Sequence, residues 1–180
     1  EGRAVRARQL DEGLDVVAGL LRGQPFSYAG TQWSISEVTE LIPPGPVQRP
    51  HPPIWCVGAL VPGRTRQPSL ERAARWQGIL PAVAGGAEGS SGLTLEALRE
   101  IVGRVRGIRE AAGLGMDGYD VVVEGDSHGS FGSVRPPISA WSDAGATWWV
   151  ESWWDLPDGL DQRESTLAET RRRLAQGPPA

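Results

Sequence analysis

The chain has 180 residues and a formal net charge of −4, with 39% hydrophobic and 22% charged residues, the composition of a globular protein long enough for one domain with a sizeable core. The acidic balance argues against nucleic acid as a main partner, because phosphate-binding surfaces usually make a domain basic. No apolar run approaches the ~20 residues of a membrane span, and the single cysteine, Cys56, excludes an intrachain disulfide and favours a reducing cytoplasm.

The first 53 residues are predicted to form a helix, a hairpin and a connector. Over residues 1–22 apolar side chains recur at helical spacing, and Gly23 ends the pattern. Residues 24–36 alternate around Gly30 as in a β-hairpin, and residues 42–53 are too rich in proline for helix or strand, which predicts an extended connector. We expect the apolar stripe of the helix to pack in a core rather than to bind a partner. It consists of Leu10, Leu14, Val17 and Leu21.

From residue 54 onward, four short apolar runs alternate with helical segments. Strands that alternate with helices predict a parallel sheet and an α/β fold, here within a single domain over residues 1–180. The glycine-rich, polar and aromatic segments all follow strands, and ligands of such folds gather beyond the carboxyl ends of the strands. The predicted strands cover residues 54–57, 78–82, 121–124 and 147–150.

Two groups of residues could carry chemistry at those strand ends. Val57, Gly58 and Ala59 close a strand with small side chains, so a flat ring or a phosphate could approach their backbone closely. Glu124 and Glu151 end neighbouring strands, and two carboxylates that point into one mouth can do acid–base work. The alternative for each carboxylate is a structural bond to a loop backbone or an arginine.

His51 lies between prolines and is predicted to be structural, and Cys56 is predicted to be a small buried apolar residue. His128 lies in a glycine-rich loop, where we expect a solvent-exposed side chain; the alternative is a donor to an anionic group. Their scattered spacing gives no metal signature.

Adjacent tryptophans near the C-terminus add an aromatic element. Trp148 and Trp149 must point to opposite faces of their strand, one of them toward the helices. Trp153 and Trp154 follow the strand and could either wall the mouth or pack under the last helix.

Eight short segments, taken in order, form a recognisable series. They are residues 10–15 (LDEGLD), 23–26 (GQPF), 46–50 (PVQRP), 52–55 (PPIW), 57–59 (VGA), 72–76 (RAARW), 120–125 (DVVVEG) and 144–149 (AGATWW). The series resembles the luciferase-like monooxygenases, which are flavin- or deazaflavin-dependent oxidoreductases of the bacterial-luciferase type. The resemblance implies a (β/α)₈ TIM barrel of which this chain is the C-terminal half, with strands five to eight. It implies FMN or a deazaflavin coenzyme as the cofactor and a small organic molecule as the substrate.

The same resemblance assigns most catalytic residues to the missing N-terminal half and leaves cofactor contact to this one. Two departures from the family pattern are Gln77, where an Asp is expected, and a lengthened loop over residues 60–68. Two other interpretations remain open: a glycoside hydrolase that uses Glu124 and Glu151, and a non-catalytic half-barrel binding module. The implied cofactor contacts are Cys56, Val57, Gly58, Ala59, Leu80 and Pro81.

A half-barrel would have two open sheet edges, at residues 54–57 and 147–150. We therefore expect a homo-oligomer, aggregation, or association with the missing half, rather than a well-behaved monomer. Glu1 falls inside a predicted helix and the sole methionine is Met116, so we interpret the sequence as a segment of a longer chain.

Overall fold

The computed structural model describes residues 2–40, 45–85, 92–125, 136–152 and 160–177, without the side chains of residues 160–163. The chain divides into two compact units, Glu1–Ile54 and Trp55–Ala180, and the boundary falls directly after the proline-rich connector. Whether the two units belong to one domain, as the sequence analysis assumes, stays a prediction. Within the described residues, no helix combines the length and apolarity needed to cross a membrane.

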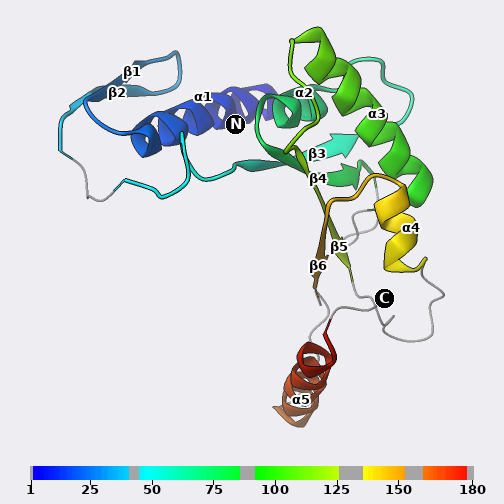
Figure 1. The fold of residues 1–180 in the computed structure, drawn as a ribbon. Coiled ribbons are helices and arrows are strands. Elements are labelled where there is room, and N and C mark those ends of the chain that lie inside the picture. Colours follow the sequence, from blue (N-terminus) through cyan, green and yellow to red (C-terminus); the bar gives the residue numbers. More distant parts are fainter. Residues whose placement is uncertain (1, 41–44, 86–91, 126–135, 153–159, 178–180) are drawn as a thin grey trace. The chain divides into compact units, whose positions relative to one another are not determined.

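The N-terminal unit consists of a helix and an antiparallel hairpin, as predicted (Figure 1). Helix α1 (Arg3–Arg22) ends at Gly23, whose φ of 127° suits glycine. Strand β1 (Phe26–Ala29) pairs antiparallel with β2 (Ser34–Val38). The connector was predicted to lack helix and strand, and its described part, residues 45–53, contains neither.

The hairpin packs on a face of α1 that the apolar stripe does not occupy. Gly19 lies under the Phe26 ring, which an added Cβ would overlap, and the Trp33 indole donates to the Gln9 carbonyl at 3.0 Å. As a result Leu10 and Val17 are 50% and 48% exposed. The prediction that these two stripe residues are core residues is therefore wrong. The hairpin packs instead on the face of α1 that contains Gly19 and the Gln9 carbonyl.

Glu12 fixes the hairpin turn to α1. Its carboxylate accepts hydrogen bonds from the Thr31 hydroxyl at 2.6 Å and from the backbone N–H groups of Thr31, Gln32 and Trp33 at 2.8 to 3.0 Å. These bonds, the hydroxyl first, lower the pKa of Glu12 from 4.5 to about 2. The stability that the carboxylate contributes is therefore present above its ordinary pKa and lost as pH falls toward 2.

We expect Glu12→Gln to release the hairpin turn at neutral pH, because a neutral amide offers a single acceptor oxygen to four donors. Amide NMR shifts of residues 31–33 during an acid titration measure this. The wild type should lose the bound shifts between pH 4.5 and 2, and the variant should lack them throughout. Glu37→Gln, on the exposed part of β2, is the matched control. Unchanged shifts in Glu12→Gln would contradict the assignment.

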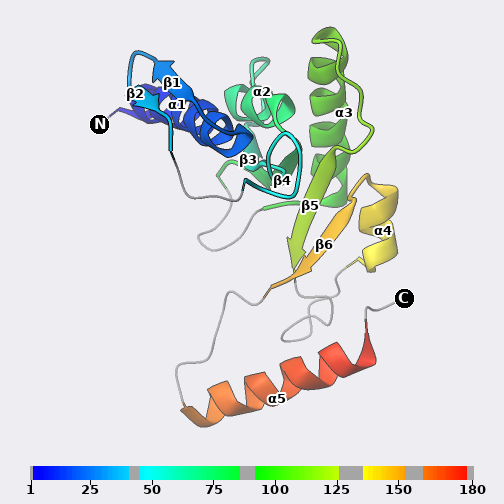
Figure 2. The ribbon, with the colours of Figure 1, turned by 60° about the vertical axis from the view of Figure 1, so that its left-hand side comes forward.

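The C-terminal unit is a four-stranded parallel sheet whose strands alternate with helices along the chain (Figure 2). This confirms the predicted α/β class and the four strand–helix units. The strand order is β3-β4-β5-β6, with every neighbouring pair parallel. The elements in chain order are β3 (Trp55–Leu60), α2 (Pro68–Arg75), β4 (Gly78–Val83), α3 (Leu95–Ala111), β5 (Asp120–Gly125), α4 (Ile138–Asp143), β6 (Trp148–Glu151) and α5 (Leu160–Gln176).

One face of this sheet packs against helices. The strand residues on that side meet α2 and α3 in the core, and Trp149 meets Trp141 of α4 with ring centroids 6.3 Å apart. Thr94 caps α3 by accepting a hydrogen bond from the Ala97 N–H at 3.1 Å. The largest fully buried side chains on this side of the sheet are Leu70, Ile79, Leu98, Ile101, Val105, Val121 and Val123.

The opposite face of the sheet exposes large apolar side chains, and we call it the open face. Trp55 is 37% exposed, Val57 62% and Trp148 51%. Val122 lies on this face by register with Trp148 but is buried, so the exposed part runs over β3, β4 and the start of β6. The predicted open edges are also confirmed in the described residues, since β3 and β6 each pair with one strand only.

Candidate functional site

The open face begins with a hydrogen-bonded row at the amino ends of the strands. The Asp120 carboxylate accepts from the Trp55 indole at 2.9 Å and from the Trp148 indole at 2.8 Å. The two rings are 5.7 Å apart at an interplanar angle of 52°. Gly78 lies between them on β4, where an added Cβ would come within 2.5 Å of Trp55 and 2.9 Å of Asp120. The row thus ties together all four strands.

This row is the base of the sheet rather than its ligand-binding end. Trp55, Gly78, Asp120 and Trp148 are each the first residue of their strand, whereas ligands of parallel α/β folds bind at the carboxyl ends. Both indole N–H groups are used by Asp120, so the rings present only their apolar surfaces. We interpret the row as the structural floor of the open face.

Above this floor, the open face is lined by small and aliphatic side chains. Val57 is the register partner of Leu80, and Ala59 is the partner of Ala82. The large pair lies in the middle of the strands and the small pair lies nearer their carboxyl ends. The surface is therefore apolar, and its side chains become smaller toward the end where ligands of this fold class bind.

The predicted cofactor contacts do not all share this face. Val57, Ala59 and Leu80 lie on the open face, whereas Cys56, Gly58 and Pro81 alternate with them and direct toward the helices. At Gly58 an added Cβ would overlap the end of the Ile79 side chain and lie 3.0 Å from Leu70 of α2. A side chain added at Gly58 would therefore enter the core between the sheet and α2 and would not reach the open face.

Glu124 and Glu151 do not form a carboxylate pair. Glu124 is the register partner of Val150, and Glu151 is the partner of Gly125, so the two carboxylates leave opposite faces of the sheet. Glu151 accepts from the Trp149 indole at 2.9 Å and pairs with Arg173 of α5 at 3.1 Å. The structural alternative holds for Glu151, and only Glu124 remains on the open face.

The loop after β3 is fixed by two side chains. Buried Gln67 accepts from the Val61 N–H at 2.9 Å and donates to the carbonyls of Val61 and Arg64, each at 2.8 Å. The Ser69 hydroxyl accepts from the Ala59 N–H at 3.1 Å and donates to the Ala59 carbonyl at 2.9 Å. The loop after β3 therefore has a defined shape, and the Ala59 backbone already has its hydrogen-bond partner.

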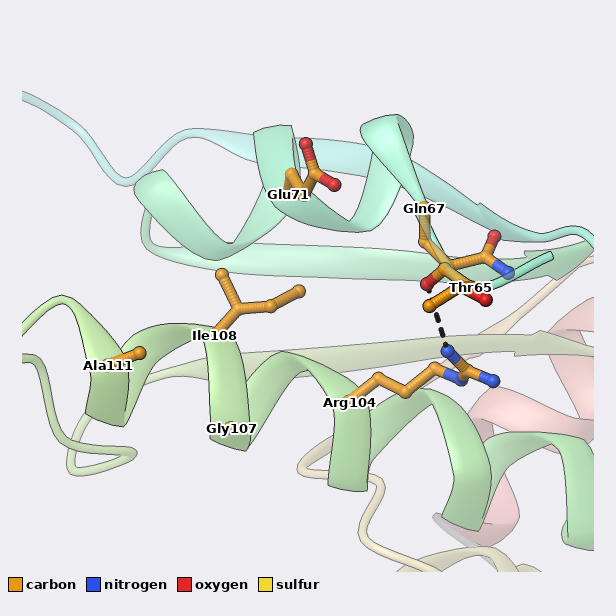
Figure 3. Close-up of a pocket in the computed structure, with 7 residues that line it drawn as sticks. All are labelled: Thr65, Gln67, Glu71, Arg104, Gly107, Ile108 and Ala111. Carbon is orange, nitrogen blue, oxygen red and sulfur yellow. Dashed lines mark hydrogen bonds between the residues drawn. The ribbon is translucent and has the colours of Figure 1, made fainter.

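A cavity of about 370 Å³ lies between the loop after β3, α2 and α3 (Figure 3). Its charged groups are already paired: Glu71 with Arg66 at 3.2 Å, and Arg104 with Glu100 at 2.8 Å. Arg104 also reaches the Thr65 carbonyl, at 3.5 Å. The cavity belongs to the helix layer, and its polar groups serve the packing of α2 on α3.

Of the other residues named in the sequence analysis, two are buried and three lie outside the described residues. His51 and Cys56 are buried, as expected for structural residues. His128, Trp153 and Trp154 lie outside the described residues. Among the described residues, no cluster of His, Cys, Asp and Glu has the arrangement of a metal site.

Sequence reasoning missed Asp120, which joins two tryptophans from strands on either side. The sequence feature that could have identified Asp120 is an acidic residue at the first position of an apolar strand. Tryptophan occupies the same first position in two other strands. A scan against models of known protein families gave no match, and neither did a comparison with curated proteins. The function must therefore be inferred from this geometry and the sequence resemblance.

Proposed function

We propose that residues 55–180 are the cofactor-binding half of a (β/α)₈ barrel in a luciferase-like oxidoreductase of the cytoplasm. Its cofactor is FMN or a deazaflavin coenzyme, and its substrate is a small organic molecule. The observation that supports this most directly is the open face, where Val57 pairs with Leu80 and Ala59 with Ala82 above an aromatic floor. A flat, largely apolar ring system fits a surface of this kind.

In this proposal the chain supplies position and a dry surface, and the bound cofactor supplies the redox chemistry. Val57 and Leu80 exclude water from one side of the ring, and Ala59 leaves room at the carboxyl ends of the strands. Glu124 lies on the same face at the end of β5 and can accept a hydrogen bond from a bound molecule. Cys56, Gly58 and Pro81 support this surface from behind.

Of the two alternative functions, the observations oppose the glycoside hydrolase and one of them favours the binding module. A glycoside hydrolase needs two carboxylates flanking one bond, and Glu124 and Glu151 leave opposite faces of the sheet. A non-catalytic binding module is favoured by one specific observation, the two sheet edges at β3 and β6. It predicts association without any effect of cofactor.

Titration of the chain with FMN and with a deazaflavin coenzyme tests the proposed function. We expect a visible-range absorbance shift and quenched cofactor fluorescence with one of them. Leu80→Glu, on the central strand β4, should abolish the response because it places a charge on the apolar surface. Leu174→Glu, on an exposed position of α5, is the matched control. No response with either cofactor, or equal binding by Leu80→Glu, would reject the proposal.

A further inference from the structure

The C-terminal unit has both of the features that sheets normally conceal. Its open face exposes Trp55, Val57 and Trp148, and β3 and β6 have one neighbour each among the described strands. Exposed strand edges pair readily with other chains, and proteins usually protect them with lysine, proline or a covering element. Neither β3 nor β6 contains a lysine or a proline.

The outer edge of β3 is closed at one end only. Ser69 satisfies both backbone groups of Ala59, whereas the Leu60 carbonyl faces β4 and accepts from the Ala84 N–H at 2.8 Å. Backbone groups alternate between the two sides of a strand, so those of Trp55 and Val57 also face outward. Residues 55–58 are therefore the part of β3 that can accept another strand, and β6 is likewise four residues long.

We propose that two copies of this chain pair β3 of each with β6 of the other, parallel and with Trp55 opposite the partner's Trp148. This interface does not depend on the identity of any ligand. A second copy supplies an edge of matching length in the required direction. The register also places Val57 opposite the partner's Val150, so residues of the open face continue on one side of the combined sheet.

The strand count allows closure after two copies. Two copies contribute eight parallel strands, and the interior of a barrel of about eight strands is either filled by side chains or holds one small ligand. Both open faces would then line that interior. A contact between two different edges is head-to-tail, so it must either close or extend into fibres, and burying the open faces favours closure.

Side-chain burial alone would not hold such a dimer together. The exposed parts of Trp55, Val57 and Trp148 amount to roughly 300 Å² in each copy, well below the ~800 Å² that each partner of a stable complex usually buries. The backbone pairing at the two edges must therefore contribute. A charge at Val57, which lies on both the edge and the open face, should disrupt the dimer most directly.

Light scattering of the purified 180-residue chain tests this proposal. We expect the wild type to have twice the 19.3-kDa chain mass and Val57→Lys to have the mass of one chain, with helix and sheet content retained by circular dichroism. Val47→Lys, at an exposed position of the other unit, should remain a dimer. A monomeric wild type, open-ended oligomers, or a folded Val57→Lys that stays dimeric would overturn it. Mass is read without cofactor, so failure here is distinct from failure to bind a flavin.

Discussion

Gly58→Val is expected to destabilise the C-terminal unit by about 1–3 kcal/mol, the range for overpacking a core. An added Cβ at Gly58 would overlap the end of Ile79 and lie 2.9 Å from its Cγ1 and 3.0 Å from Leu70 Cδ2. Ile79 and Leu70 are both fully buried, so the close-packed core leaves them little space in which to move away from the added side chain. Urea denaturation followed by circular dichroism measures the loss.

Gly103→Val is the matched control for this change. Gly103 is an exposed residue of α3, and an added Cβ there meets nothing within 4 Å. Valine is also a slightly better helix former than glycine, so this variant should be as stable as the wild type or slightly more stable. If Gly58→Val is as stable as Gly103→Val, then residue 58 faces the open side of the sheet and the faces have been assigned the wrong way round.

The order of the elements could be predicted from the sequence because it depends on local patterns. Apolar runs that alternate with amphipathic segments specify strands and helices, and parallel pairing follows from the alternation. The opposite directions of Trp148 and Trp149 follow from the two-residue period of a strand. Trp148 reaches Asp120 and Trp149 meets Trp141, as that period requires.

The assignment of side chains to faces could not be predicted, because it depends on the register between strands. In the sequence Glu124 and Glu151 each follow an apolar run, yet the register pairs Glu124 with Val150 and Glu151 with Gly125. An offset of one residue sends a side chain to the other face, and nothing within either strand encodes that offset. Alternation along β3 places Gly58 opposite to Val57, but nothing within the strand shows which of its two faces the helices cover.

Interactions between residues far apart in the sequence could not be predicted from it either. Glu12 and the turn at residues 31–33 are about 20 positions apart, and Trp55 and Asp120 are 65 positions apart. Each polar residue looked like an ordinary surface residue. Only the fold shows that Glu12 and Asp120 each accept several hydrogen bonds from groups that would otherwise need water.

Arg109→Ala is expected to cost about 3 kcal/mol, because one guanidinium satisfies carbonyls from two segments. Arg109 donates to the carbonyls of Ala74 at 2.8 Å and Trp76 at 3.1 Å, at the end of α2, and to that of Gly115 at 2.8 Å. The last carbonyls of a helix have no partner within it and favour a cation. The same group lies 4.4 Å from the centre of the Tyr119 ring.

Tyr119 extends this connection into the core. Its hydroxyl donates to the Ala73 carbonyl at 3.1 Å, and burial raises the pKa of the phenol above its usual range, so it stays a neutral donor. Removal of Arg109 would expose one face of this ring and leave the end of α2 uncapped. Arg109→Lys should recover only part of the loss, because an ammonium group lacks the planar fork that reaches several carbonyls at once.

Urea denaturation of Arg109→Ala, Arg109→Lys and Arg106→Ala decides whether this role is specific. Arg106 is exposed on the same helix, so its replacement removes the same charge without the carbonyl contacts and should change stability by less than about 0.5 kcal/mol. Equal losses at Arg106 and Arg109 would mean that the net charge of α3 matters and the carbonyl contacts do not. A large loss at Arg109 alone, partly restored by lysine, would establish that this side chain holds α2, α3 and the start of β5 together behind the open face.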